Sequence, residues 1–401
     1  MIARAGQICA IWVLSVLSAT AVMAQEAEVA PEAEPEQAAD ETVPEKKGFL
    51  AQMKDPEDGK FDISQYLLDN LVGFLPVPLI ITEPAVDNGL GLAGAFFHKP
   101  KADQMQVRDG NLILPNISVV AAAYTGNESW FVGGGHLRNW SKDRFRYEVM
   151  GGYANINLDW YGSDGGPIED TGLRFNVEGA MLDQKFLVRI GDSRWYMGPD
   201  LRILNSDVSF DLGLPVDLPT VENSVVTLSL VTIYENLDFK LSPRSGLQLE
   251  FDASVSREAI GSDFDYEQLS WKARQFFEFG DKYFFGWRLD GSTTSGDVPF
   301  YLEPFVELEG IPAMRFQGPT AATAEIRGGV DITPRWSLLG FVGSGRTGDS
   351  VSDLSSAESH SAYGVGFRYL MARRLGLRLG LDVAKGPEDT YVYLIVGSAW
   401  R

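Results

Sequence analysis

Residues 374–384 read RLGLRLGLDVA, and this stretch carries the pattern that decides the fold. Leu375, Leu377, Leu379, Leu381 and Val383 alternate with arginine, glycine and aspartate. Successive side chains of a β-strand point to opposite faces. The stretch therefore predicts a strand with one apolar face and one charged or small face.

The same alternation recurs along most of the chain, for example in residues 246–256, 321–332 and 361–370. It predicts fifteen candidate strands, near residues 88–98, 112–124, 127–139, 144–158, 172–189, 194–206, 223–236, 246–257, 266–279, 283–294, 321–332, 336–345, 361–370, 374–384 and 390–400. A single-chain bacterial barrel has an even number of strands. We therefore predict sixteen, with the missing strand inside residues 172–214.

The alternation fits both a soluble barrel or sandwich with its apolar face inward and a membrane barrel with that face toward lipid. Three features favour the membrane: segments near ten residues long, inner faces that combine arginine, acids and glycine, and aromatics at segment ends. No run of eighteen apolar residues follows the N-terminal region, which excludes a helical membrane protein. The predicted fold is all-β, a transmembrane antiparallel β-barrel over residues 87–401. The aromatics at segment ends are Trp336, Tyr363, Tyr369 and Trp400.

The N-terminus has the features of a secretory signal peptide over residues 1–24. Arg4 is followed by an apolar run at residues 8–22, and Ala24 supplies the small residue before a cleavage site. An uncleaved membrane anchor is the alternative, but the apolar run is short for one. Cys9 is the chain's single cysteine and would be removed with the signal.

Residues 25–60 are predicted to be a disordered acidic linker. Residues 26–45 alone contain eight acids and no base, interrupted by prolines, a composition that cannot bury a core. Residues 61–86 follow as a short amphipathic helix at 61–73 and an extended, proline-containing lead-in at 74–86.

Composition excludes other classes of protein. The net charge of −21 disfavours nucleic-acid binding, and the 45% hydrophobic content excludes wholesale disorder. His98, His136 and His360 show no metal-ligand spacing, and no nucleophile elbow is present. We therefore predict no metal, no cofactor and no enzymatic activity.

Residues 314–318, MRFQG, resemble a variant of the Arg-Gly-Phe/Tyr loop motif of the surface-antigen barrel superfamily, which includes the BamA and TamA insertases and the two-partner secretion translocases. The resemblance implies that this long loop folds back into the lumen, where its arginine meets a polar residue of the inner wall. The implied loop lock consists of Arg315, Phe316, Gln317 and Gly318.

Residues 341–345, FVGSG, resemble the superfamily's Phe-x-Asp-x-Gly strand, with Phe341 and Gly345 in place but Gly343 where the aspartate is expected. Glu325 is therefore the candidate partner of the loop arginine. Trp400, next to the C-terminus, resembles the terminal aromatic assembly signal. The superfamily's periplasmic POTRA modules have no counterpart, since residues 46–87 are too few for such a unit.

The resemblance implies a multi-pass barrel in the outer membrane of a Gram-negative bacterium, with its N-terminus in the periplasm. The implied role is insertion or translocation of proteins or other envelope molecules. Expected partners are outer-membrane lipid, the barrel-assembly machinery during biogenesis, and a periplasmic partner or client protein, with no nucleic acid. A passive solute pore is the alternative, because inward charges could also select solutes. The third and least favoured hypothesis is an outer-membrane enzyme.

Overall fold

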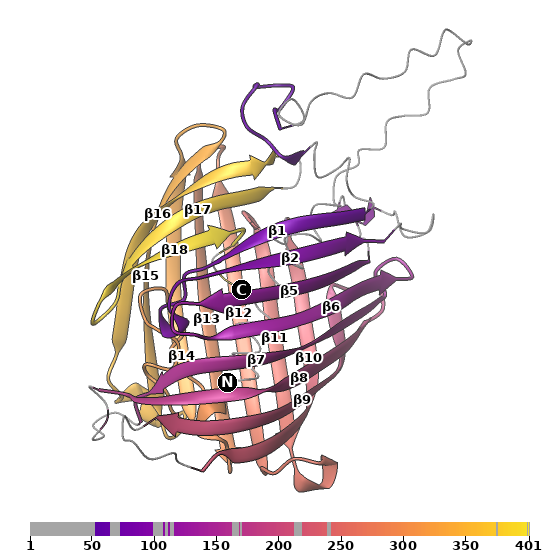
Figure 1. Ribbon diagram of the computed structural model, residues 1–401. Coiled ribbons are helices and arrows are strands. Elements are labelled where there is room, and N and C mark those ends of the chain that lie inside the picture. Colours follow the sequence, from indigo (N-terminus) through magenta and orange to yellow (C-terminus); the bar gives the residue numbers. More distant parts are fainter. Residues whose placement is uncertain are drawn as a thin grey trace.

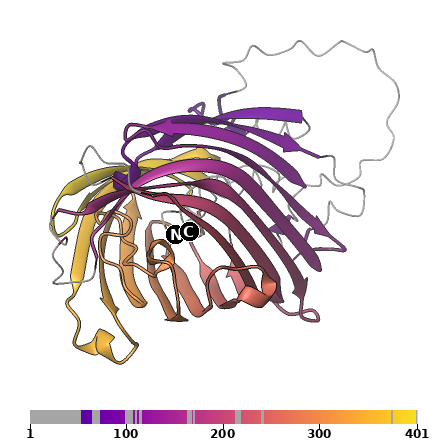
Figure 2. The same cartoon turned by 60° about the horizontal axis from the view of Figure 1, so that its bottom comes forward.

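A computed structural model shows one sheet of sixteen strands wound into a nearly closed barrel (Figures 1 and 2). It describes residues 53–64, 73–98, 107–108, 111–112, 116–162, 168, 171–211, 219–238, 242–373, 376–398 and 400. The barrel strands are β1 (Gly73–Ile81), β2 (Gly89–Phe97), β5 (Ile117–Thr125), β6 (Trp130–Trp140), β7 (Phe145–Trp160), β8 (Leu173–Arg189), β9 (Trp195–Asp211), β10 (Val221–Leu237), β11 (Gly246–Ser256), β12 (Tyr266–Phe279), β13 (Tyr283–Gly296), β14 (Thr320–Asp331), β15 (Trp336–Gly348), β16 (His360–Ala372), β17 (Leu377–Lys385) and β18 (Thr390–Val396).

Each barrel strand pairs antiparallel with the next one in the sequence, from β1 to β18. A separate small hairpin joins β3 (Val107–Arg108) to β4 (Asn111–Leu112). Short 3-10 turns complete the structure: η2 (Pro84–Val86), η3 (Glu258–Ile260), η4 (Phe300–Leu302) and η5 (Asp353–Ser355). Within the part of the chain that the structure describes, no helix is long and apolar enough to cross a membrane, which says nothing of a β-barrel.

The sixteenth strand is β1, so its predicted place inside residues 172–214 is wrong. Among its described residues, that region holds two whole strands, β8 and β9; β8 matches its predicted range, and β9 extends past its predicted end at residue 206 to Asp211. The sequence analysis took β1 for an extended lead-in because it contains Pro76 and Pro78. Proline cannot donate a ladder hydrogen bond, so within sheets it is found on edge strands. β1 is such an edge, because it pairs only with β2, and the barrel therefore starts at Gly73 rather than at residue 87.

The outward faces of the strands are apolar, as a transmembrane barrel requires. Leu90 on β2 and Val365 on β16 are 70% and 66% exposed, and most other strands also expose large apolar side chains. Toward the loop end, β7 and β8 carry polar residues on this face instead, among them Asn155, Asn176 and Glu178. Trp336 is exposed on the outer face and packs against Tyr369 and Phe367, with ring centroids 4.8 and 5.8 Å apart. The soluble alternative is excluded by this outward apolar face, and the predicted membrane-type barrel is confirmed.

The inward faces carry charged side chains that are nearly inaccessible. Asp200, Arg288, Glu325 and Asp382 are each buried, and all make ion pairs with neighbouring strands or with the same strand. A charge taken out of water is tolerated only when it is paired and hydrogen-bonded. The wall of the barrel is therefore held from inside by polar contacts.

The two ends of the barrel differ in their connections. One end, the turn end, has tight turns such as residues 280–282 and 332–335, together with one longer connection at residues 98–116. The other end, the loop end, has longer connections at 161–172 and 349–359 and the longest of all at 297–319. The described N-terminal segment and the end of β18 both lie at the turn end.

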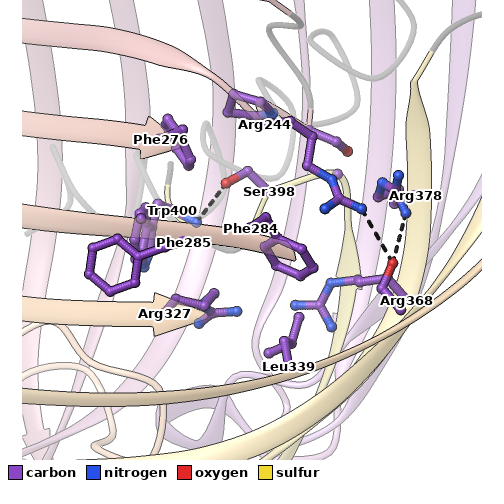
Figure 3. A pocket seen from close by; sticks show the side chains of 15 residues that line it. Arg244, Phe276, Phe284, Phe285, Arg327, Leu339, Arg368, Arg378, Ser398 and Trp400 are labelled. Carbon is purple, nitrogen blue, oxygen red and sulfur yellow. Dashed lines mark hydrogen bonds between the residues drawn. The ribbon is translucent and has the colours of Figure 1, made fainter. Parts of the chain in front are cut away.

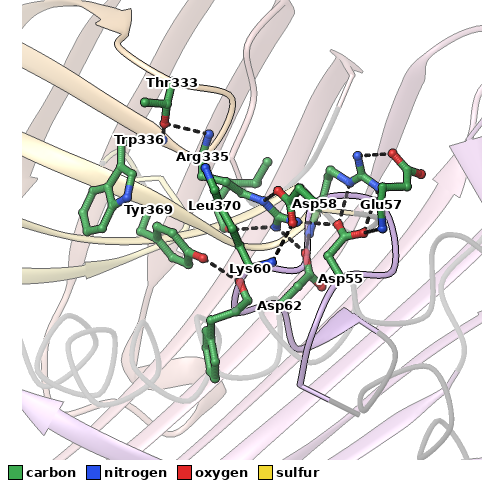
Figure 4. Close-up of polar contacts among 12 residues, drawn as sticks. Asp55, Glu57, Asp58, Lys60, Asp62, Thr333, Arg335, Trp336, Tyr369 and Leu370 are labelled. Carbon is green, nitrogen blue, oxygen red and sulfur yellow. Dashed lines mark hydrogen bonds and ion pairs between the residues drawn. The ribbon is translucent and has the colours of Figure 1, made fainter. Parts of the chain in front are cut away.

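Residues 53–64 form an ordered segment that is bound to the turn end (Figure 4). Arg335, in the turn between β14 and β15, contacts the carboxylates of Asp55, Asp58 and Asp62, with 2.7 Å between its Nε and the Oδ2 of Asp58. The side chain of Arg335 is only 1% exposed. We call this cluster the arginine clamp.

Backbone contacts extend the clamp along β16. The N–H of Ile63 donates to the carbonyl of Met371 at 2.9 Å, and the hydroxyl of Tyr369 donates to the carbonyl of Phe61 at 2.6 Å. Arg373 also pairs with Asp55 at 2.9 Å.

The prediction of a disordered linker over residues 25–60 is wrong at its C-terminal end. Residues 53–60 are ordered because Asp55 and Asp58 pair with Arg335, and the composition of the segment does not reveal this pairing. Residues 1–52, with the predicted signal peptide and the rest of the linker, lie outside the described residues. So does most of the predicted helix at 61–73. Among the described residues, none forms a β-α-α-β-β unit.

Substitution Arg335→Gln should release residues 53–64, because it leaves the buried carboxylate of Asp62 without a cation and that of Asp55 with only the partly exposed Arg373. Breaking a buried charge cluster costs about 3 kcal/mol. Limited proteolysis within residues 53–64 and urea unfolding of the refolded protein would measure the effect. Arg373→Gln is the matched control: its side chain is 34% exposed, so its loss should cost less than about 1 kcal/mol. Equal effects of the two substitutions would contradict the clamp.

Candidate functional site

The loop between β13 and β14 folds into the lumen and carries the predicted loop lock (Figure 2). Its two arms run antiparallel: the N–H of Val306 donates to the carbonyl of Phe316 at 2.9 Å, and that of Gly318 to Pro304 at 3.0 Å. Its apolar side chains form a buried cluster with β16, made of Val306, Leu308, Ile311, Phe316 and Ala362. We call residues 297–319 the lumen loop.

Two glycines of β15 make room for this cluster. A Cβ atom built on Gly343 would lie 2.5 Å from Cδ2 of Leu308, and one on Gly345 would lie 2.4 Å from Cγ1 of Val306. Phe341 lies on the same inward face and is buried. An aspartate at position 343 would therefore collide with the loop as it is packed here.

Arg315 pairs with Glu388, in the turn between β17 and β18, so its predicted pairing with Glu325 is wrong. The Nε of Arg315 donates to Oε1 of Glu388 at 2.7 Å. Its guanidinium also lies over the rings of Tyr161, at 4.5 Å, and Phe316, at 4.7 Å. The arginine thus ties the lumen loop to the last hairpin of the barrel.

The other predicted lock residues hold the arms of the loop. The ring of Phe316 stacks on His360 of β16, with centroids 3.5 Å apart and planes 8° apart. The side-chain amide of Gln317 donates to the carbonyl of Phe300. The backbone of Gly318 closes the two arms.

Glu325 lies 3% exposed at the centre of a polar network on the inner wall. Its Oε2 is 3.0 Å from Nη2 of Arg288, and its Oε1 is 3.0 Å from Nη2 of Arg327. Arg327 reaches on to Asp382 at 2.9 Å, and Arg368 also pairs with Asp382. Glu325 therefore joins β13, β14 and β17 through arginines.

The network also holds the lumen loop. Arg288 donates to the carbonyl of Glu307 at 2.6 Å, and Arg327 lies 3.3 Å from the carboxylate of Glu309. Glu325 is thus connected to the loop through Arg288 and Arg327, which contact both, and not through an ion pair with Arg315.

Trp400 also joins this network, so its predicted place in an outer aromatic girdle is wrong. Its indole N–H donates to Oε1 of Glu325 at 2.9 Å, and its ring packs on Phe276 with centroids 5.4 Å apart. The side chain is 5% exposed, because the chain turns inward after β18 ends at Val396. Its role as an assembly signal remains a prediction.

The barrel wall has an open seam between its first and last strands. Among the described residues, β1 and β18 share no ladder pairing, although they are neighbours in the barrel (Figure 1). One direct hydrogen bond near the loop end crosses the seam, from the N–H of Leu394 to Oγ1 of Thr82 at 3.2 Å.

The tip of the lumen loop bridges the same seam from inside. The N–H of Gly310 donates to the hydroxyl of Tyr393 on β18 at 2.9 Å. The N–H of Ala313 donates to Oε1 of Glu83, just after β1, at 3.3 Å. One loop therefore contacts both edges of the open seam, and we call these two contacts the loop strap.

Glu83 makes docking of the lumen loop sensitive to pH. Burial raises the pKa of Glu83 to about 7, although the N–H groups of Ala313 and Ala85, which donate to its carboxylate, act in the opposite direction. The sequence analysis missed Glu83, Tyr393 and Glu388. The alternation of apolar and polar residues does not single out these three, because each contacts a segment that is distant in the sequence.

The described residues show no cluster of three or more His, Cys, Asp or Glu side chains that could hold a metal ion. His98 and His136 both lie within hydrogen-bond distance of Oγ of Ser118, at 2.8 and 2.9 Å. His360 is covered by Phe316 in the loop lock. His98 and His136 are therefore neighbours, with ring centroids 5.4 Å apart, and His360 lies elsewhere in the barrel.

No family model and no curated protein sequence matches this chain. Among solved structures it is similar to BamA from Haemophilus ducreyi lacking POTRA domains 1-3, with a TM-score of 0.55 and 11% identity over 81% of this chain and 69% of that one. It is also similar to CdiB from Escherichia coli, with a TM-score of 0.55 and 8% identity over 81% of this chain and 62% of that one. CdiB from Acinetobacter baumannii gives a TM-score of 0.51 at 9% identity, over 80% and 59%.

The chain thus spans about three fifths of the CdiB chains and about two thirds of the BamA chain that it matches. The likeness confirms the predicted resemblance to surface-antigen barrels at the level of fold. At these identities it shows the fold alone.

Substitution Gly345→Ala should push the lumen loop off the inner wall. The added Cβ would overlap Val306, which is fully buried and has no room to move. Overpacking of this kind costs about 1–3 kcal/mol, so the undocked loop should become populated and single-channel conductance in planar bilayers should rise. Gly340→Ala on the same strand is the control, because its nearest contact is an ordinary 3.7 Å. Equal conductance of the two variants would rule out the docking contact.

Docking of the lumen loop, which buries Glu83, should weaken as pH rises from about 4.5 to 7. An acid whose pKa is higher in the docked state keeps its proton there, so docking is strongest at low pH and loses this contribution as Glu83 ionises. The frequency of channel opening should rise at least about tenfold between pH 5 and pH 8. Glu83→Gln stays neutral and can still accept from Ala313, so its opening should vary much less over that range. If Glu83→Gln keeps the full pH dependence of channel opening, a titratable group other than Glu83 is responsible for it.

Proposed function

We propose that this chain is an outer-membrane barrel that opens between β1 and β18 to insert or translocate proteins or other envelope molecules. The observation that carries the proposal is the seam: the described residues of β1 and β18 share no ladder pairing and are joined by the hydrogen bond from Leu394 to Thr82 and by the loop strap. In this proposal the lumen loop keeps the seam and the lumen closed until a client arrives.

Unpaired strand edges offer the chemistry for such a role. An edge presents a row of free N–H and C=O groups that can template an added strand. Inside a bilayer these groups have no water to bind, so an incoming strand that pairs with them gains more than it would in solution. Pro76 and Pro78 remove two donors from β1, which limits how firmly the edges can pair with each other.

The filled lumen supports this role over a passive pore. The lumen loop places a buried apolar cluster against β15 and β16. Arg288 donates to the backbone carbonyl of Glu307, and Arg327 pairs with the carboxylate of Glu309, so the inner wall also holds the loop by polar contacts. A steady pore needs a hydrated path past these groups. Solute conduction would therefore require the loop to move.

The placement in the cell follows from the same proposal. Short turns face the periplasm and long loops face outward in outer-membrane barrels of bacteria. We accordingly place the turn end, with the N-terminal segment, in the periplasm of a Gram-negative cell. The partners are membrane lipid, the machinery that assembles the barrel, and a periplasmic partner or client; none of these roles needs a catalytic residue, and we propose no enzymatic activity.

A disulfide across the seam tests the proposal. Thr82→Cys with Leu394→Cys joins the residues that already share the seam hydrogen bond. Cys9, the only native cysteine, lies in the predicted signal peptide. The oxidised variant, reconstituted in liposomes, should lose most of its ability to insert a urea-unfolded eight-stranded outer-membrane protein, and reduction should restore it.

The matched control places a disulfide across a seam that is already paired. Val383→Cys with Val392→Cys joins facing residues of β17 and β18 and should leave insertion unchanged. If the oxidised variant inserts the client as well as the reduced protein does, opening between β1 and β18 is not needed and the proposal is rejected. If neither form inserts the client but both conduct solutes steadily, the pore is the better account.

A further inference from the structure

A pocket at the turn end, beside the C-terminal segment, is lined by four arginines (Figure 3). They come from three strands and one turn: Arg327 of β14, Arg368 of β16, Arg378 of β17 and Arg244 of the turn before β11. The cavity holds about 70 Å³ and is partly open. No carboxylate is among its fifteen lining residues. The carboxylates that pair with Arg327, Arg368 and Arg244 lie behind the pocket wall and not among its lining residues.

The charges around the pocket are not fully satisfied by the protein. Arg244 is 8% exposed and pairs with Asp331 at 2.6 Å through Nη2, but its buried Nη1 has no hydrogen-bond partner. Arg378 donates to Oγ of Ser337 at 2.9 Å, and the carboxylate paired with it, that of Asp331, is 4.0 Å away. Unpaired buried donors are costly, so they favour an acceptor brought in from outside.

The rest of the pocket wall is apolar. It is formed by the aromatic rings of Phe276, Phe284, Phe285 and Trp400 and by Leu339. The guanidinium of Arg244 lies 4.0 Å from the ring centre of Phe284, which holds it against this wall. Cationic donors and an apolar wall in one pocket suit a ligand with an anionic head and a hydrocarbon part.

We propose that this pocket binds a phosphate-bearing amphiphile, namely a lipid headgroup with the start of its hydrocarbon chain. A single carboxylate offers two oxygens and one charge, enough for one guanidinium fork. A phosphomonoester offers three free oxygens and up to two charges, enough for the unpartnered Nη1 of Arg244 and for the weakly paired Arg378 together. The inference does not depend on the proposed insertion role.

The test uses the full mature protein, refolded and held in amphipol, with hexyl phosphate as the probe. Isothermal titration should show one saturable site. Hexyl phosphate should bind at least about tenfold more tightly than inorganic phosphate, hexanol or hexanoate, because each of these lacks the hydrocarbon part, the charge or the third oxygen.

Arg378→Gln is the test variant, because this arginine has the weakest ion pairing of the four and its loss disturbs the wall least. It should weaken hexyl phosphate binding about tenfold or more, and Arg378→Lys should recover part of the loss. Arg346→Gln, at the loop end, removes an arginine that donates to the carbonyls of Leu354 and Ser355, and should leave binding unchanged. Heat-modifiability on gels verifies that each variant is folded.

Several results would overturn the proposal. Absence of saturable binding, or equal binding to wild type and Arg378→Gln, would show that the pocket is not the site. If inorganic phosphate binds as tightly as hexyl phosphate, the ligand is a free anion and not an amphiphile. If hexanoate binds as tightly as hexyl phosphate, the pocket does not select phosphate over a carboxylate. Binding of hexanol as tight as that of hexyl phosphate would mean that the arginines contribute nothing.

Discussion

The two hydrogen bonds of the loop strap, from Gly310 to Tyr393 and from Ala313 to Glu83, join both edges of the seam, and the closed state that we propose depends on them. A barrel abolishes strand edges only when its first and last strands pair. Among the described residues, β1 and β18 share no ladder pairing, so the seam must be held together in another way. The lumen loop does part of this work from inside, since its tip contacts both edges at once.

The position of that loop is fixed by three different kinds of contact. Arg315 attaches it to the hairpin of β17 and β18, and the inner-wall arginines bind its backbone. Its apolar side chains fill the space left open by Gly343 and Gly345. Because these contacts belong to separate strands, moving the loop would loosen several parts of the wall together. This coupling makes the loop suited to control the seam.

The arginine clamp gives the turn end a second point of control. It ties residues 53–64 to the ends of β14, β15 and β16, a short way along the wall from the pocket of four arginines. Two buried charge clusters thus lie at the end proposed to face the periplasm. One is satisfied by the chain's own carboxylates, and the other retains donors without a partner.

The sequence by itself determined that the chain forms a membrane barrel, because an alternation of period two is a local property that every strand displays on its own. It also indicated the inward loop and the residues of its lock, through a short motif. Only the tertiary structure decided that β1 is a barrel strand, that Arg315 meets Glu388 rather than Glu325, and that Trp400 turns into the lumen. Each of these depends on which distant segments become neighbours when the sheet curls. Ion pairs between positions as far apart as Asp55 and Arg335 leave no periodic trace in the chain, since a charged residue looks the same in sequence whether it faces water or a buried partner.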